Sequence, residues 1–224
     1  MRLNTKRDKL GEVNLNQMQP STSDCCPPGL ERINQFALVS YLPDPLGKFL
    51  DDLRRHLVPD CKPHAHVTIL PPRPLCGAPE EAARELRELS RDFDPFSIRL
   101  GAVTKFQETD VVYIELASGS DKLRAMYNKM NRGASLYCER YQYSPHITLA
   151  QNIPHETVDR IFEEAKIAWR ACPYDRFFDV EELSFVQNTT TCQWIDLETF
   201  PLHPQVPIGV ATRKVRAVHH QHRA

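Results

Sequence analysis

His66-Val67-Thr68-Ile69 returns eighty residues later in the chain as His146-Ile147-Thr148-Leu149. In both strings a histidine and a threonine alternate with two apolar residues. Because successive side chains of a β-strand point to opposite faces, a strand over each string would place its histidine and threonine on one face and its apolar residues in a core. We therefore predict two motif strands, each offering one imidazole and one hydroxyl on the same face.

The combination of these side chains indicates a chemistry. Imidazoles give and take protons near neutral pH, and threonine hydroxyls donate hydrogen bonds. Two motif strands lying side by side would aim two imidazoles and two hydroxyls at one small anionic group. A phosphate ester fits that description.

The segments around the two strings alternate between strand and helix periodicity. Asp44 and Pro45 predict the start of a helix, and Pro71-Pro72 predicts the end of the first motif strand. The expected order is a strand at 36–42, a helix at 44–57, the first motif strand at 65–70, a helix at 79–93, strands at 96–106 and 111–116, a helix at 120–130, the second motif strand at 146–150, a helix at 158–169, and strands at 177–186 and 191–199.

This order repeats strand, helix, motif strand, helix, strand twice, with one further strand at the end. A period near eighty residues is too long for a solenoid and favours two similar α+β lobes packed against each other. Motif strands in equivalent places of the two lobes would meet at their interface, where ligand clefts tend to form. The expected fold class is α+β and bilobal, with pseudo-two-fold duplicated sheets, helices on the outside and a central groove.

Composition divides the 224 residues into three parts. Residues 1–32 are polar and predict a flexible N-terminal arm, residues 33–203 hold the bilobal domain, and residues 204–224 predict a flexible basic C-terminal tail. No apolar run approaches the roughly 18 residues of a membrane span. The seven cysteines form no C-x-x-C pair, which suits a reducing cytoplasm, so we expect a cytoplasmic protein without a membrane partner.

The charge of the domain restricts its partners. Residues 33–203 hold 19 Lys and Arg against 25 Asp and Glu, so the domain is not a general polyanion binder. A compact site for one phosphate or for a short oligonucleotide end is compatible with this charge, because a few local donors suffice. No obligate protein partner is inferred.

Several other chemistries lack their sequence signals. The chain has no metal-binding histidine pair such as H-x-x-x-H or H-E-x-x-H, no G-x-S-x-G elbow, no P-loop and no G-x-G-x-x-G string. An unrelated α+β protein is the competing interpretation, with threonine present only as a good strand former and each histidine as a satisfied edge residue.

With both strings intact, the chain resembles the two-histidine (2H) phosphoesterase superfamily, and within it the bacterial 2′-5′ RNA ligase and cyclic nucleotide phosphodiesterase family. The resemblance spans about residues 34–200. It implies two lobes with antiparallel sheets around a central groove, and metal-independent chemistry on 2′,3′-cyclic or 2′-5′ phosphodiesters with no cofactor. Carried over by position, His66 and His146 would be the acid/base pair, and Thr68 and Thr148 would donate to phosphate oxygens.

The chain also departs from its relatives. Many of them place an arginine directly after the second motif, whereas here Ala150 is followed by the neutral Gln151, so the phosphate charge needs another cation. Arg73 is the first candidate, and Lys105 and Arg140 are further ones. Aromatic residues near the second motif, Tyr143 and Tyr141, either stack on a base or pack in the core.

The expected function is therefore a phosphoesterase acting on a nucleotide or a short RNA end, and by reversibility a 2′-5′ RNA ligase. The alternative is a binding module that keeps the phosphate cleft without turnover, as Gln151 and the acidic domain suggest. The sequence does not say which of His66 and His146 is the acid.

Overall fold

Residues 31–204 are described by a computed structural model, and the arm and the tail predicted for the two ends lie outside this range except for their innermost residues. The described chain contains eight strands and four helices, where the sequence predicted seven strands and four helices. The strands are β1 (Arg32–Tyr41), β2 (His66–Arg73), β3 (Phe96–Lys105), β4 (Val112–Ser118), β5 (His146–Ala150), β6 (Phe177–Val180), β7 (Glu182–Thr189) and β8 (Trp194–Pro201). The helices are α1 (Leu46–Leu57), α2 (Pro79–Ser90), α3 (Ser120–Met130) and α4 (Val158–Arg170), with short 3₁₀ turns at Gly133–Ser135 and His155–Thr157.

The strands form two four-stranded sheets with the orders β2-β1-β7-β8, here called sheet A, and β5-β4-β3-β6, called sheet B. Every neighbouring pair whose register is resolved runs antiparallel. The two orders match place by place, so each motif strand is the edge strand of its sheet. The predicted duplicated α+β fold with antiparallel sheets is confirmed.

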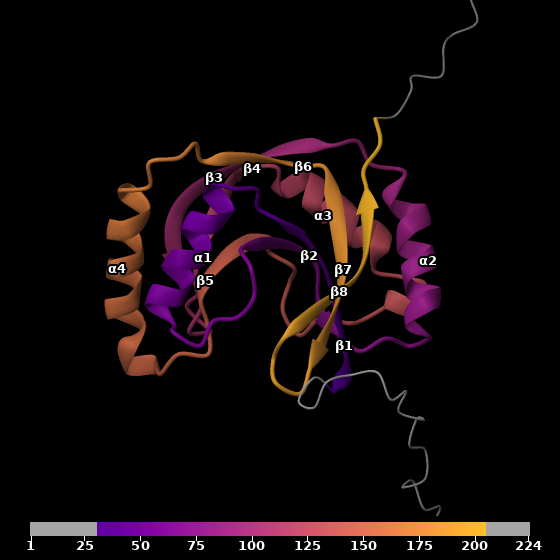
Figure 1. Cartoon of the computed structure of the whole chain (residues 1–224), viewed down its shortest axis with the longest axis horizontal. Coiled ribbons are helices and arrows are strands. Elements are labelled where there is room, and N and C mark those ends of the chain that lie inside the picture. Colours follow the sequence, from indigo (N-terminus) through magenta and orange to yellow (C-terminus); the bar gives the residue numbers. More distant parts are fainter. Residues whose placement is uncertain (1–30, 205–224) are drawn as a thin grey trace, which may run out of the picture.

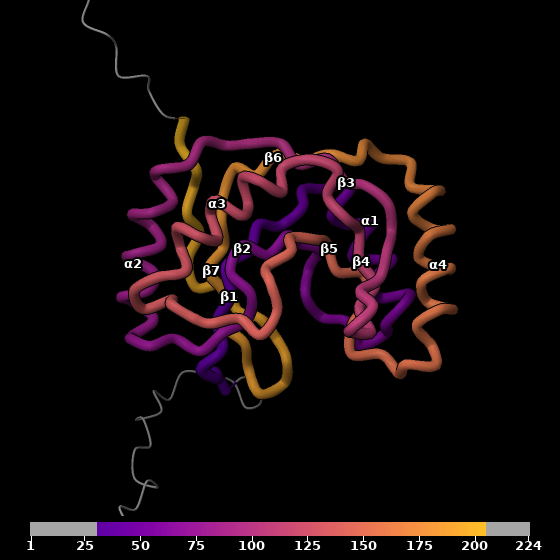
Figure 2. Tube along the Cα trace, turned by 180° about the vertical axis from the view of Figure 1, so that it is seen from behind, coloured from indigo at the N-terminus to yellow at the C-terminus, as the bar shows by residue number. Residues whose placement is uncertain are grey.

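The helices cover the two lobes from outside. Helices α1 and α4 pack together against sheet B, while α2 and α3 pack together beside sheet A, at the opposite end of the molecule (Figure 1). Helix α1 therefore follows a strand of sheet A but packs against β5 of sheet B, and α3 follows a strand of sheet B but packs against β2 of sheet A. The view from behind shows the same crossing of the chain between the lobes (Figure 2). This exchange ties the two halves into one body around a shared apolar core.

The helix starts follow from local sequence. Pro79 occupies the first turn of α2, where its missing N–H costs nothing. Helix α1 begins at Leu46, one residue after the predicted first position Pro45, and the Asp44 carboxylate accepts a hydrogen bond from the Lys48 N–H at 2.9 Å. Asp44 thus satisfies one of the N–H groups left open at the helix start.

Two strand predictions were wrong. Pro71-Pro72 does not end β2, which continues to Arg73, because β2 is an edge strand and one side of an edge has no partner for an N–H. The single strand predicted at 177–186 is two strands, β6 and β7, which lie in different sheets. The chain crosses between the sheets at Glu181, whose carbonyl oxygen accepts the Leu202 N–H at 2.7 Å.

Within residues 31–204, no helix has both the length and the apolar character needed to cross a membrane.

Candidate active site

The motif strands lie side by side at the junction of the two lobes. Strands β2 and β5 are the edges of sheets A and B, and they contact each other. Each shows the same burial alternation, in which histidine and threonine are half-buried and the apolar residues between them are buried. The predicted period of two is therefore present in both strands.

The four motif side chains open into one cleft. A cavity of about 1090 Å³ is lined by His66 and Thr68 from one lobe and by His146 and Thr148 from the other. Within residues 31–204 neither threonine hydroxyl is hydrogen-bonded to another protein group, so both are free to donate to a ligand. The structure thus brings together all four residues for which the sequence predicted a catalytic role.

The two imidazoles are held by identical hydrogen bonds. His66 Nδ1 lies 2.6 Å from the carbonyl oxygen of His64, and His146 Nδ1 lies 2.7 Å from that of Ser144. Since a carbonyl oxygen can only accept, each Nδ1 carries a proton in the neutral ring. The Nε2 atoms are left as the nitrogens that can take up or give a proton.

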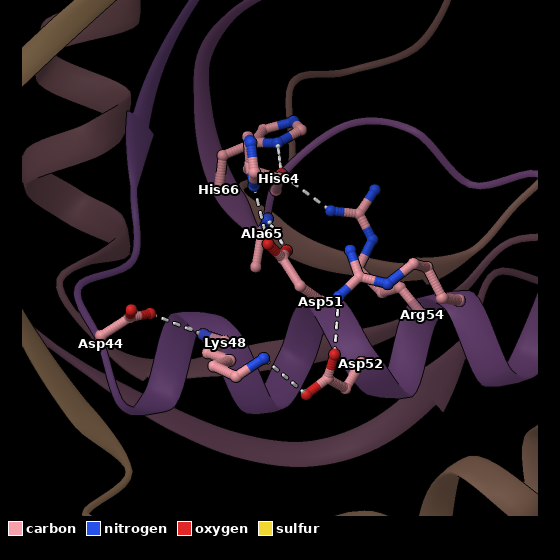
Figure 3. Close-up of polar contacts among 9 residues, drawn as sticks. Asp44, Lys48, Asp51, Asp52, Arg54, His64, Ala65 and His66 are labelled. Carbon is pink, nitrogen blue, oxygen red and sulfur yellow. Dashed lines mark hydrogen bonds and ion pairs between the residues drawn. The ribbon is translucent and has the colours of Figure 1, made fainter.

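Helix α1 places charged groups beside the first histidine (Figure 3). Arg54 donates to the His64 carbonyl oxygen at 2.8 Å, the same oxygen that accepts from His66. Asp51, one turn earlier on the helix, accepts from the Ala65 N–H and lies 2.7 Å from His64 Nδ1. Arg54 and Asp51, on one face of α1, therefore fix the backbone at residues 64 and 65, which includes the carbonyl oxygen that orients the His66 ring.

Arg54 is an unusual residue in this position. It lines the cleft with only 3% of its surface exposed, and its Nε atom is buried without a hydrogen-bond partner. No carboxylate within residues 31–204 forms an ion pair with it. A guanidinium that is buried and not neutralised by a partner leaves its positive charge acting on the cleft.

The environment favours the neutral form of both histidines. Burial, and then the positive charge of Arg54, lowers the pKa of His66 to about 4. Burial also lowers the pKa of His146, against which the hydrogen bond to Ser144 acts. The charge of His146 contributes to the lowered pKa of His66, which couples the two rings.

Aromatic side chains surround the second histidine. The Phe106 ring lies 5.1 Å from the His146 ring in an edge-on arrangement and stacks on Tyr113 at 4.1 Å. Tyr113 itself lies 4.9 Å from His146. Tyr41 also lies beside His66, with its ring 6.4 Å from the His66 ring, so the two halves differ in the charged groups beside His66 and in the closer, stacked rings beside His146.

Tyr143 crosses from the second half to the first. Its hydroxyl donates to the Thr68 carbonyl oxygen at 2.6 Å, and its ring stacks on Tyr127 at 4.3 Å. Burial raises the pKa of Tyr143, so the hydroxyl keeps its proton. Tyr143 lines the cleft as predicted, but these contacts use it to hold the first motif strand. Gln151 also lines the cleft, with an exposed side chain.

The three cations named from the sequence lie in different places. Arg73 does not line the cleft: it is 2% exposed and donates to Asn131, to the carbonyl oxygens of Pro71 and Ser135, and to Glu139 at 2.6 Å. This network argues against the phosphate contact expected of Arg73. Lys105 forms an ion pair with Asp159 outside the cleft. Arg140 lines the cleft and lies over the Tyr141 ring at 5.2 Å.

Sequence reasoning missed Arg54 and Asp51. Both lie on a helix that was recognised from its leucine stripe, and Arg54 follows Leu53 into the buried face. The sequence did hold one signal for Arg54, which is an arginine on the buried face of a predicted helix. Arginine is rarely buried without a partner, so such a position points to a functional or structural role.

As for metal ligands, residues 31–204 contain no group of three or more histidine, cysteine, aspartate or glutamate side chains placed to hold an ion. The side chains of the cleft are instead suited to proton transfer, through two Nε2 atoms, and to hydrogen-bond donation, through two hydroxyls.

A sequence profile of the 2′-5′ RNA ligase superfamily matches residues 42–191. Proteins provisionally named phosphoesterases match as well. That of Bacillus cytotoxicus is 24% identical over 147 residues, covering 61% of this chain and 82% of the relative. That of Geobacillus kaustophilus is 20% identical over 177 residues, covering 74% and 95%. The match to a third, from Oceanobacillus iheyensis, is 27% identical over 77 residues but spans only 45% of that relative and 34% of this chain.

Solved structures share the fold. Escherichia coli LigT complexed with NADP⁺ superimposes with a TM-score of 0.53 at 16% identity, and LigT complexed with 3′-AMP gives a TM-score of 0.52 at 14% identity. Both alignments cover 78% of this chain and 99% of LigT.

Proposed function

The chain belongs to the 2′-5′ RNA ligase superfamily of two-histidine phosphoesterases, and on this premise we propose that it hydrolyses 2′,3′-cyclic phosphates of nucleotides by acid/base catalysis between His66 and His146. The observation that carries the proposal is the convergence of both histidines and both threonines on one cleft. The nucleotides bound to LigT in its solved structures support a nucleotide substrate.

The surroundings of the two rings support different roles for them. Arg54 disfavours a second positive charge on His66, so His66 is the base, whose Nε2 takes a proton from water. His146 has no cation among the groups that shift its pKa, and the negative charge of a bound phosphate favours its protonated form. His146 is therefore the acid.

In the reaction, the water oxygen bonds to phosphorus as His66 removes a proton from it. The bond from phosphorus to one ribose oxygen breaks, and His146 gives that oxygen its proton. Thr68 and Thr148 donate to the non-bridging oxygens, where negative charge grows, and the charge of Arg54 acts in the same direction. His66 ends protonated and His146 neutral, and exchange with solvent resets the pair. With a ribose 5′-hydroxyl in place of water in the first step, the same site would join a cyclic end to another strand.

Turnover of adenosine 2′,3′-cyclic phosphate, followed as release of the monophosphate with and without EDTA, tests the proposal. General acid and base steps are each worth about 10² to 10⁴ in rate, so His66→Ala and His146→Ala should each lose that much with the fold retained. His155→Ala is the matched control, because His155 is exposed, pairs with Asp110 and does not line the cleft.

The outcomes separate the alternatives. Binding of the cyclic nucleotide without turnover would contradict the proposed phosphoesterase activity and would favour a binding module. Activity that survives both His66→Ala and His146→Ala would contradict the proposed roles of the two histidines as base and acid. Activity lost to EDTA and restored by a metal ion would show that proton transfer alone does not account for the reaction.

A further inference from the structure

The cleft is far larger than its phosphate site requires. Pockets of about 300 to 1,000 Å³ hold whole small molecules, and this one measures about 1090 Å³. Beyond the motif residues, much of its wall is the inner face of sheet A. Most of the remaining wall comes from the segments 106–111 and 139–145, so sheet A is the apolar wall against which a group attached to the phosphate can pack.

The floor of this region is apolar and continuous with the catalytic strand. Ala37, Val39 and Val186 form a small buried cluster separate from the main core, and all three line the cleft. In the antiparallel register Val39 pairs with Thr68 on β2, and Ala37 pairs with Val186 on β7. Paired residues of neighbouring strands share a face, so the floor runs from Thr68 across β1 to β7.

Two aromatic side chains stand beside this floor. Tyr41 and Trp194 are partly buried, pack on the apolar cluster and line the cleft. Tyr41 pairs in register with His66, and its hydroxyl donates to Asp196 on β8 at 2.6 Å, which fixes the ring across the sheet. The three floor residues are 2 to 5% exposed, so a ligand meets chiefly the two partly buried rings, whose faces suit a flat group. We call the slot formed by Ala37, Val39, Val186, Tyr41 and Trp194 the sheet A slot.

Sheet B offers no equivalent slot. Tyr113 pairs in register with Thr148 as Val39 does with Thr68, and it stacks on Phe106, so sheet B has a large ring where sheet A has a valine. This difference makes the two sides of the cleft unequal. It leaves more room for a bulky group on the His66 side.

The charges of the cleft limit how much phosphate it holds. The described lining residues include three cationic side chains, of Arg54, Lys62 and Arg140, and two carboxylates, of Glu108 and Glu139. Lys62 donates to the Thr191 carbonyl oxygen at 2.7 Å. Proteins that bind extended single strands combine aromatic platforms with a positively charged groove that follows the backbone. A lining of nearly balanced charge suits one phosphodiester.

We propose that the substrate class is a mononucleotide-like phosphodiester, with a single negative charge and one flat aromatic group that packs in the sheet A slot against Trp194. This inference rests on the proposed phosphoesterase function and narrows it. A strand of RNA, with several phosphates, is then a poor substrate.

Three compounds with the same reacting bond test the inference by their kcat/KM. They are adenosine 2′,3′-cyclic phosphate, 1-O-methylribose 2′,3′-cyclic phosphate, which lacks the base, and adenosine 2′,3′-cyclic phosphate carrying a 5′-phosphate. Base stacking on an aromatic side chain corresponds to about tenfold or more in affinity, so the compound without a base should be poorer by that factor. The 5′-phosphate should lower kcat/KM or leave it unchanged.

Variants tie this preference to the slot. Trp194→Ala should reduce the preference for the base to about threefold or less, and Trp194→Phe should retain most of it, because the ring is kept. Phe177→Ala is the control, since Phe177 is 48% exposed on β6 and does not line the cleft. A preference unchanged by Trp194→Ala, or a gain of tenfold from the 5′-phosphate, would overturn the inference while leaving the phosphoesterase in place.

Fluorescence separates the slot from the chemistry. The chain has two tryptophans, and Trp169 is buried in α4 with its N–H bonded to the Gly101 carbonyl oxygen. Adenosine 2′,3′-cyclic phosphate should quench the fluorescence of the wild type and not that of Trp194→Phe. Quenching without any turnover would support the slot and contradict the proposed function. Equal quenching of both proteins would place the base elsewhere.

Discussion

His66 and His146 are held by the same hydrogen bond, in which each Nδ1 donates to the carbonyl oxygen of the residue two positions earlier. The bond fixes both rings and leaves both Nε2 atoms for chemistry. The duplication thus delivers two equivalent rings, and the difference between acid and base has to come from their surroundings. In the proposed mechanism, Arg54, which donates to the oxygen that holds His66, supplies that difference.

Removing the charge of Arg54 should shift the pH dependence of the reaction. Arg54 lowers the pKa of His66, so Arg54→Gln should raise it and move the acid limb of kcat/KM to higher pH. Arg54→Lys keeps a charge and should shift the limb less. Arg55→Gln is the control, because Arg55 is an exposed neighbour paired with Asp52. A shift of the alkaline limb instead would make His66 the acid.

The threonine hydroxyls should matter in the transition state. Loss of one donor to a developing oxyanion costs about 10² to 10³ in kcat, so we expect that loss from Thr68→Val and from Thr148→Val. Valine keeps the shape and strand preference of threonine, and each Thr→Ser variant should recover most of the rate. The measurement is kcat on a 2′,3′-cyclic nucleotide, with the melting temperature as a check on the fold. Valine variants within threefold of the wild type would exclude the proposed donation.

Arg73 should support the fold and not the phosphate. Breaking a buried ion pair from one side costs about 3 to 5 kcal/mol, because the remaining charge loses its partner. Arg73→Met should therefore lower the unfolding free energy in urea by several kcal/mol and leave KM unchanged at a temperature where the variant is folded. Adding Glu139→Gln should recover part of the stability. A raised KM at unchanged stability would support the phosphate contact that the sequence predicted for Arg73.

The contrast between Arg73 and Arg54 shows how far sequence reasoning reached. Period-two alternation depends only on neighbouring residues, so the two motif strings were sufficient to predict which side chains face the cleft. The helices and the duplication likewise follow from local periodicity. The direction in which Arg73 points does not, because it depends on Asn131 and Glu139, which approach from the far half of the chain.

Arg54 was missed for a related reason. Its partner is a backbone carbonyl, and backbone atoms carry no sequence signal. The crossing at Glu181 was missed because apolar strand residues lie both before and after this residue. Strands β6 and β7 are distinct only because they pair with different sheets. Pairing partners are set by tertiary structure.

The neutral state of His66 should cost stability in acid. The pKa of His66 is lowered by burial and by Arg54 from its ordinary 6.5 to about 4, so between these values the unfolded chain takes up a proton that the folded chain does not. Unfolding free energy therefore falls as the pH drops through this window, and below about pH 4 the loss is complete.

His66→Gln removes this proton uptake. Between pH 7.5 and pH 5 its unfolding free energy should fall less than that of the wild type, by about 1 kcal/mol once solvent screening at a half-buried ring is allowed for. His155→Gln should show the opposite direction, because the hydrogen bond to Asp110 raises the pKa of His155 and stabilises the folded state in acid. Urea unfolding of the three proteins at both pH values measures the differences. Parallel losses in the wild type and His66→Gln would mean that folding does not lower the pKa of His66, and the assignment of His66 as the base would lose its support.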